Sequence, residues 1–132
     1  MKVVHALPFP GVGGTEVGTV RIMEAVAPHG VTSHALLVHP SSELRAYIEA
    51  VNVTVTDAAP VPQPSLRGAR AFLSDSRRLA AQLQALHPDL VHCADILAAY
   101  HISVACRMAG IPVLCQVRSR YGELPFRERF MV

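Results

Sequence analysis

The sequence predicts an α/β fold in which a parallel sheet is buried between two layers of helices. Of the 132 residues, 51% are hydrophobic and 17% are charged, which is too apolar for a disordered chain and suits a sheet covered on both faces. Short apolar runs alternate along the chain with segments of helical periodicity, and glycines and prolines separate them. The length suits one domain, which we assign to residues 1–132.

The chain begins with a strand, a glycine-rich turn and a helix. The apolar run KVVHAL at residues 2–7 predicts the strand. From Thr15 onward, apolar residues recur on one helical face, and Gly30, followed by Val31, suits a left-handed cap that ends the helix. A second strand is predicted over residues 32–39, where TSHALLVH forms the next apolar run.

A second helix begins at Ser41 or Ser42, because a serine side chain can accept a hydrogen bond from the free N–H groups of a first helical turn. Its apolar residues have the spacing of one helical face, and they are Leu44, Tyr47, Ile48 and Val51. The third strand is predicted over residues 52–56. Prolines at positions 60, 62 and 64 then exclude a helix or a central strand and indicate a surface loop.

The remaining segments repeat this alternation. Helices are predicted over residues 68–87 and 96–109, and the apolar runs at residues 89–94 and 113–117 predict the fourth and fifth strands. In the helix over residues 68–87, the residues expected to face the core are Phe72, Leu79, Leu83 and Leu86. In the helix over residues 96–109, which ends at Gly110, they are Leu97, Tyr100, Val104 and Met108.

Five strands that alternate with helices imply right-handed crossovers and a parallel sheet, most simply in the order 3-2-1-4-5. The predicted fold is therefore a Rossmann-like three-layer sandwich. In such a sheet the crossovers reverse direction between strands one and four, and ligands bind there, outside the carboxyl ends of the strands. The glycine loop after strand one and the sequence HCAD at residues 92–95 flank this crevice.

Charge and cysteine content exclude several classes of protein. The formal net charge is +2 and no basic run exceeds two residues, so we expect no nucleic-acid partner and no polybasic membrane surface. The three cysteines form no C-x-x-C pair, which indicates neither a disulfide framework nor a zinc knuckle. No apolar stretch approaches the ~20 residues of a membrane span, and we expect a cytoplasmic protein without a transmembrane segment.

The glycine loop is the first candidate binding site. Gly13 and Gly14 lack the Cβ atoms that would hold a ligand away, and the helix start behind them has free N–H groups with partial positive charge. Such a loop suits phosphate, carboxylate or sugar oxygens, and it also suits a tight turn with no ligand. Glu16 lies in the first helical turn, where it stabilises the helix dipole. The alternative is that it orients the glycine loop or bonds a ligand hydroxyl.

Residues at the end of the fourth strand are further candidates. His92 is predicted beside the glycine loop, either as a hydrogen-bonded structural residue or as the catalytic residue. Asp95 suits an N-cap of the helix that starts at Ile96 and is also a candidate substrate contact. We predict no metal site, because strand spacing sends His92 and Cys93 to opposite faces of the sheet and no second histidine follows His101 at helical spacing.

The loop after the fifth strand adds two arginines at the same edge of the sheet. Arg118 and Arg120 can bind a carboxylate or phosphate bidentately, or they lie in a solvated loop. Two alternative classes stay open. A small Rossmann-type oxidoreductase would need an acidic ribose ligand after strand two, where the chain has His39. A non-enzymatic flavodoxin-like binding domain would have a cluster of acidic residues at the strand ends, and Glu16 with Asp95 is a thin cluster.

Several motifs together resemble the N-terminal half of a family 4 glycosyltransferase of the GT-B fold. The first is MKVVHALPFPGVGGTE, with a strand, a proline-containing loop and GGxE. The second is LHPDLVHCADILAAY, with the short strand PDLVH and a helix of small residues, and GIP before strand five is the third. The similarity covers nearly all 132 positions.

The resemblance implies retaining transfer of a sugar from a nucleotide-sugar donor, a UDP- or GDP-sugar, to a sugar, lipid or small-molecule acceptor, without another cofactor. It places Gly13 and Gly14 against the donor diphosphate or the acceptor. Many members have an H-x-H pattern after strand four. Here the first histidine is His92 and the second position is Ala94, which lacks a side chain for the role of that histidine. Arg118 and Arg120 fall where members often place acceptor-binding residues.

The family's second Rossmann domain is not within these 132 residues. The resemblance therefore implies an incomplete, acceptor-side N-terminal half, and we expect it to be inactive alone, because the absent half supplies much of the charge stabilisation of the donor. The full-length enzyme is expected to be cytoplasmic and peripheral to the membrane. The apolar C-terminal sequence RFMV is expected to favour self-association.

Overall fold

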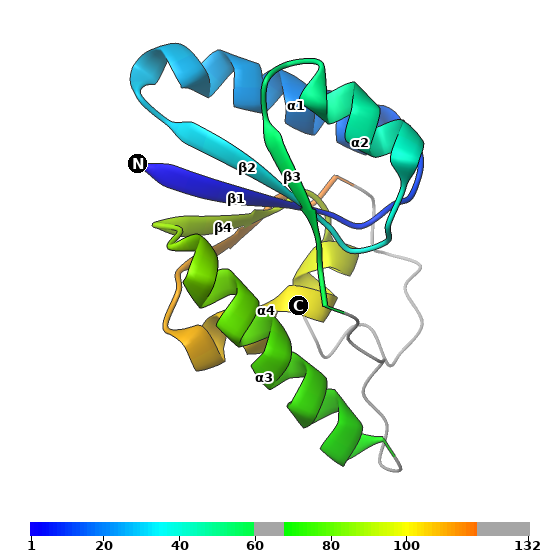
Figure 1. Cartoon of the computed structure of the whole chain (residues 1–132), viewed down its shortest axis with the longest axis vertical. Coiled ribbons are helices and arrows are strands. Elements are labelled where there is room, and N and C mark those ends of the chain that lie inside the picture. The colour runs from blue at the N-terminus through cyan, green and yellow to red at the C-terminus, as the bar shows by residue number, and fades with distance from the viewer. Residues whose placement is uncertain (60–67, 119–132) are drawn as a thin grey trace.

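A five-stranded sheet forms the centre of the computed structural model, which describes residues 1–59 and 68–118 (Figure 1). The strands are β1 (Lys2–Leu7), β2 (Thr32–Leu37), β3 (Thr54–Asp57), β4 (Leu90–Cys93) and β5 (Val113–Cys115). They lie in the order β3-β2-β1-β4-β5, and every neighbouring pair is parallel. The predicted α/β class and strand order are confirmed.

Four helices connect these strands, and a short 3-10 turn follows the first of them. They are α1 (Gly14–Val26), η1 (Ala27–His29), α2 (Ser42–Glu49), α3 (Ala69–Leu86) and α4 (Ile96–Ala109). Gly30 and Gly110 have φ values of 75° and 70°, so both are the left-handed caps that the sequence predicted. After α1 the chain continues in the 3-10 geometry of η1 until it reaches Gly30. Pro28 lies at the start of this tighter turn.

The helices lie in two layers, α1 and α2 on one face of the sheet and α3 and α4 on the other (Figure 1). In β2, Ala35 and Leu37 face α1 and α2, whereas Leu36 between them packs in the cluster of α3 and α4. All three side chains are fully buried. Successive residues of a strand point to opposite faces, so burial on both faces accounts for the continuous apolar runs in the sequence.

The buried face of α4 differs from the predicted one. Leu97 and Met108 are 42% and 41% exposed, and the residues that enter the core are Ala98, Ile102, Ala105 and Cys106. The helix is apolar almost all round, so its periodicity does not select one face. The small side chains of the true face allow α4 to pack closely with α3, in the same cluster as Leu79 and Leu83.

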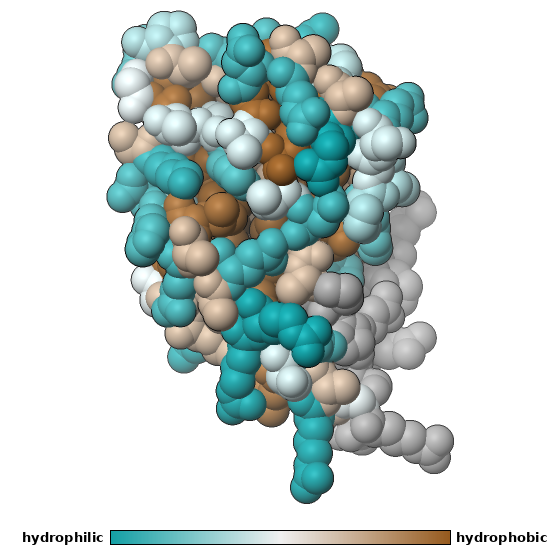
Figure 2. Space-filling model, viewed as in Figure 1, coloured by the Kyte–Doolittle hydropathy of each residue, from teal (hydrophilic) through white to brown (hydrophobic). Residues whose placement is uncertain are grey.

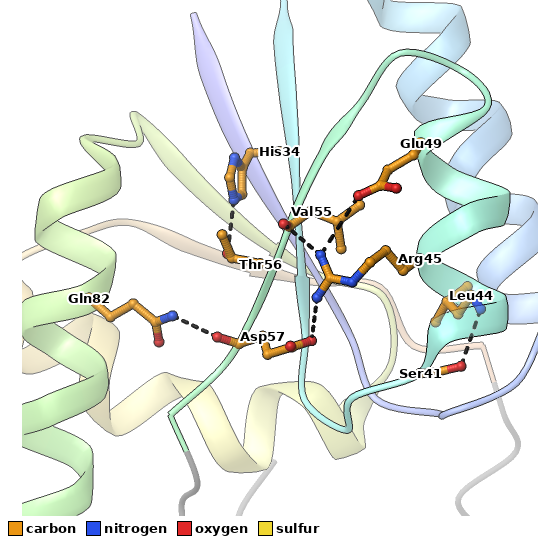
Figure 3. Close-up of polar contacts among 9 residues, drawn as sticks. All are labelled: His34, Ser41, Leu44, Arg45, Glu49, Val55, Thr56, Asp57 and Gln82. Carbon is orange, nitrogen blue, oxygen red and sulfur yellow. Dashed lines mark hydrogen bonds and ion pairs between the residues drawn. The ribbon is translucent and has the colours of Figure 1, made fainter.

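Polar contacts fix the end of β3 from both layers (Figure 3). Arg45 of α2 donates hydrogen bonds to the Val55 carbonyl at 2.9 Å and to Asp57 Oδ1 at 2.8 Å. From the other layer, Gln82 of α3 donates to the Asp57 carbonyl at 2.7 Å. At the start of α2 the Ser41 side chain accepts a hydrogen bond from the Leu44 N–H at 3.2 Å, so Ser41 is the predicted serine cap.

Polar and apolar residues are interspersed on the face of the molecule shown in Figure 2. At the edge strand β5 and just beyond it, Val113, Leu114 and Val117 are 44%, 55% and 53% exposed. Within residues 1–59 and 68–118, none of the helices has the length and apolar character needed to cross a bilayer. The C-terminal RFMV sequence and the three-proline loop lie outside the described residues.

Candidate functional site

The loop between β1 and α1 forms a hollow at the carboxyl edge of the sheet. This glycine hollow is lined by Phe9 and residues 11–16 and has a volume of about 380 Å³. Gly13 is the extended N-cap residue of α1, so the free N–H groups of the first helical turn lie directly behind the loop. A Cβ atom on Gly14 would meet no atom within 4 Å, so the main chain at Gly14 borders open space.

Glu16 supports this loop from within the helix. Its side chain is 1% exposed, and its Oε2 accepts a hydrogen bond from the Gly13 N–H at 3.3 Å. A Cβ atom on Gly13 would lie 3.1 Å from that oxygen, so a side chain there would displace the carboxylate. The other oxygen, Oε1, is buried and has no hydrogen-bond partner among the described residues. The carboxylate therefore supports the glycine loop from behind, and contact of Glu16 with a ligand hydroxyl stays a prediction.

His92 lies in β4, opposite His5 of β1. Their Nδ1 atoms are 3.0 Å apart, so one ring donates and the other accepts, and His5 Nε2 lies 3.3 Å from Ser33 Oγ. Burial, with a smaller contribution from His92, lowers the pKa of His5 to about 4. Burial also lowers the pKa of His92, a hydrogen bond with Gln116 opposes this, and the charge of Arg118 lowers it further. Both imidazoles are therefore neutral at pH 7.

His92 and the glycine loop line different cavities of the described structure. His92 lines an apolar cavity of about 490 Å³ beside α1, together with His5, Ile22, Leu114 and Gln116 among others. Neither Gly13 nor Gly14 borders this cavity. The His92 side chain is directed at His5 on the face of the sheet that α1 covers. A crevice shared by His92 and the glycine loop stays a prediction. A catalytic role of His92 stays a prediction.

Asp95 lies directly beyond β4, next to the topological switch point, and is 2% exposed. Its side chain accepts a hydrogen bond from the Leu97 N–H at 3.3 Å, so it is the N-cap of α4, as the sequence suggested. Ala94, at the second position of the H-x-H pattern, is fully buried in the cluster of α1 and α2.

Asp95→Ala is expected to lower the free energy of unfolding by about 1 kcal/mol, whereas Asp95→Asn should change it by only a few tenths, because asparagine also accepts the cap hydrogen bond. Urea denaturation of the two variants checks this. An equal loss in both would show that the negative charge of Asp95, and not its cap, stabilises the fold.

Arg118 does not point away from the molecule. Its Nη2 donates hydrogen bonds to Gln116 Oε1 at 2.8 Å and to Thr19 Oγ1 of α1 at 3.3 Å. The guanidinium lies on Gly18, and a Cβ atom at Gly18 would overlap with it. Gly18 was not among the predicted site residues, and its only signal in the sequence was a glycine inside a helix. Arg120 lies outside the described residues.

The cysteines show no sign of chemical activation. Cys93, Cys106 and Cys115 are all free thiols, and burial raises the pKa of each, that of Cys106 to about 11. Cys93 faces α3 and α4 while His92 faces α1, so the two side chains lie on opposite faces as predicted. In the part of the chain that the structure describes, no group of three or more His, Cys, Asp or Glu side chains is placed to hold a metal ion.

Comparisons with known proteins agree with this architecture. Residues 12–131 match the family described as Glycosyltransferase Family 4. The search of curated proteins found no match.

Among solved structures, HepE of Anabaena in complex with UDP and glucose is similar, with a TM-score of 0.61 and 16% identity over 86% of this chain and 28% of that one. A glycosyltransferase from Rickettsia africae has a TM-score of 0.60 and 16% identity, with the same coverage. UDP-GlcNAc 2-epimerase from Neisseria meningitidis, bound to UDP-GlcNAc, has a TM-score of 0.64 and 17% identity over 99% of this chain and 38% of that one. The chain thus spans well under half the length of these proteins.

Proposed function

The chain belongs to glycosyltransferase family 4, and from this premise we propose that it is the acceptor-side N-terminal domain of a retaining glycosyltransferase. The open main chain at Gly14 is the observation that supports this role most strongly. A ligand oxygen can approach the loop there without meeting a side chain, and the free N–H groups of α1 stabilise negative charge on it. The buried Glu16 carboxylate holds Gly13 in place, so the loop is formed before a ligand arrives.

The proposed donor is a nucleotide sugar. HepE and the epimerase were solved with UDP or a UDP-sugar, which supports a uridine nucleotide over a guanosine nucleotide. The proposed acceptor is a sugar, lipid or small molecule that binds at the carboxyl edge of the sheet. Asp95 and Arg120 are its proposed contacts. In this proposal His92 acts at the reacting centre, and Arg118 lies at the same rim.

Catalysis by this domain alone is not expected. The chain covers 28% of HepE and 38% of the epimerase, and the charge stabilisation of a departing nucleotide would come from a second Rossmann domain. We place the complete enzyme in the cytoplasm, at the periphery of the membrane. Turnover of a nucleotide sugar by the purified 132-residue chain would contradict the proposed division of roles.

Gly14→Val in the complete enzyme is expected to reduce sugar transfer at least about 100-fold, because the branched side chain fills the space that the ligand must enter. The fold should be retained, since a Cβ atom at this position meets nothing within 4 Å. The measurement is kcat/KM for transfer, with a thermal midpoint recorded on the same sample.

Gly14→Ala is the matched control and should lose much less activity, because one methyl group fills less of the hollow. Unchanged transfer in Gly14→Val would refute the glycine loop as a ligand site. Titration of the chain with UDP, GDP and NAD adds a test of the reaction class, since a shift specific to NAD would favour the oxidoreductase alternative.

A further inference from the structure

Arg118 connects the segment after β5 to the first half of α1. Its Nη2 donates to Thr19 Oγ1 at 3.3 Å, and Thr19 Oγ1 in turn donates to the Thr15 carbonyl at 2.7 Å. Thr15 directly follows Gly14 and lines the glycine hollow. A continuous hydrogen-bond chain therefore runs from Arg118 to the wall of the hollow, and bonds in such a chain strengthen one another.

Gly18 makes room for this contact. Inside a helix, glycine is less favourable than alanine because it loses more backbone freedom on folding. Here the missing side chain lets the Arg118 guanidinium lie directly on the helix, where a Cβ atom would overlap with it. Glycine at position 18 therefore lowers the intrinsic stability of the helix but allows the Arg118 guanidinium to contact its backbone. We call this contact surface at Gly18 the seat of Arg118.

The Arg118 side chain is half-buried against α1. Within the described residues Arg118 makes no ion pair within 4.0 Å, and its Nε is buried without a hydrogen-bond partner. Glu16 precedes Thr19 by three residues, so its buried carboxylate lies on the same face of α1. Arg118 is half-buried, and a partly desolvated guanidinium is stabilised by hydrogen bonds and by nearby negative charge. Glu16 supplies negative charge on that face of α1.

We propose that Arg118 is a positioning residue for the glycine hollow. It holds the first turns of α1 through Thr19 and through its contact with Gly18, and it thereby sets the position of Gly13 and Gly14, which lie more than a hundred residues earlier in the sequence. The importance of the glycine hollow for activity rests on the proposed function. The effect of Arg118 on the position of the glycine loop does not depend on that function. In this assignment Arg118 acts through the helix and does not need to touch a substrate.

Gly18→Ala separates this proposal from simple helix propensity. Propensity alone predicts a higher thermal midpoint for the alanine variant. If Arg118 positions the loop, the added methyl group displaces the guanidinium, the midpoint falls, and the first turn of α1 loosens. The readout is amide hydrogen exchange of Val17, whose N–H donates to the Gly13 carbonyl at 2.9 Å, and we expect it to become about tenfold faster.

Arg118→Met gives an independent measurement, because it keeps the aliphatic stem and removes the guanidinium. Arg118→Met should accelerate Val17 exchange by a similar factor. When Gly18→Ala is added to Arg118→Met, it should raise the thermal midpoint, whereas in the wild type it should lower it. Arg21→Ala, on the exposed surface of α1, is the control and should leave Val17 exchange unchanged. Thr19→Ser should retain slow exchange, whereas Thr19→Val should lose it.

A higher midpoint for Gly18→Ala in the wild-type background, with unchanged Val17 exchange, would overturn the proposal. The proposal would also be overturned if Gly18→Ala changed the thermal midpoint by the same amount in the wild type and in the Arg118→Met variant. Should Gly18→Ala fail to fold, Arg118→Met and the two Thr19 variants decide the same question. These measurements use the chain without ligand, so their outcome is independent of whether Gly14→Val abolishes sugar transfer.

Discussion

Lowering the pH from 7 to 4 is expected to remove about 3 kcal/mol of folding stability through His5 alone, because its pKa falls from 6.5 to about 4 on folding. Between these two values the unfolded chain binds a proton at this position and the folded chain does not. Stability therefore falls as the pH drops through 6.5 and stops falling, for this group, near pH 4. The lowered pKa of the neighbouring His92 adds a loss of the same sign.

The main physical cause of the lowered His5 pKa is burial of its ring, and the neighbouring His92 ring adds a smaller contribution. The two Nδ1 atoms are 3.0 Å apart, and the residues are 2% and 6% exposed. A proton on both rings would place two positive charges in a site with little water, so the pair titrates as a coupled unit. The pair is thus an acid-sensitive point in the centre of the fold.

Urea denaturation of the wild type and of His5→Gln, from pH 7 to pH 4, measures this effect. The glutamine amide can still hydrogen-bond to His92 but does not titrate, so the variant should show a flatter stability curve below pH 6.5. His29→Gln, at an exposed position, is the matched control and should follow the wild type. Parallel curves for wild type and His5→Gln would show that the pair does not control acid stability. Because carboxylates and His34 also titrate in acid, the difference between the curves is the relevant quantity.

Ile102→Ala is expected to lower the free energy of unfolding by about 2–5 kcal/mol, the usual cost of removing a large aliphatic side chain from a core. Ile102 of α4 is fully buried, in the cluster that contains Leu79 and Leu83 of α3. The truncation leaves a cavity that the closely packed neighbours fill only in part. Chemical denaturation, analysed with a common slope, gives the difference directly.

Leu97→Ala removes a side chain of the same size from the same helix and is the matched control. Leu97 is 42% exposed, so its loss should cost less than about 1 kcal/mol. If Leu97→Ala lowered the free energy of unfolding more than Ile102→Ala did, the buried face of α4 would be the one that the sequence predicted. That result would contradict the packing described above.

The fold was largely predictable because its signals are local. Continuous apolar runs marked the strands, and Gly30 and Gly110 marked two helix ends, since a left-handed cap strongly favours glycine. Strand order followed from the alternation of strands and helices and the fixed hand of crossovers. The face of α4 was not predictable, because an almost wholly apolar helix carries no periodic signal and the close approach of α3 selects its small residues.

The candidate site was predictable only in part. Gly13, Gly14 and Glu16 are neighbours in sequence, so their association in one hollow follows from the local turn. Their separation from His92 does not, because it depends on which way the His92 ring turns within the sheet. His5 carried no pattern in the sequence, and only the pairing of β1 with β4 brings it to His92.

The amino-acid sequence by itself thus determined the strands, the helices, their order and the glycine loop, because each depends on residues within one or two turns of chain. Tertiary structure alone decided the His5–His92 pair and the seat of Arg118 on Gly18. His5 and His92 are 87 positions apart in the sequence. Arg118 is 99 positions from Thr19, the residue that follows Gly18. The geometry of both contacts depends on strand register and on the reach of one long side chain across the molecule, and neither quantity is encoded in any local pattern.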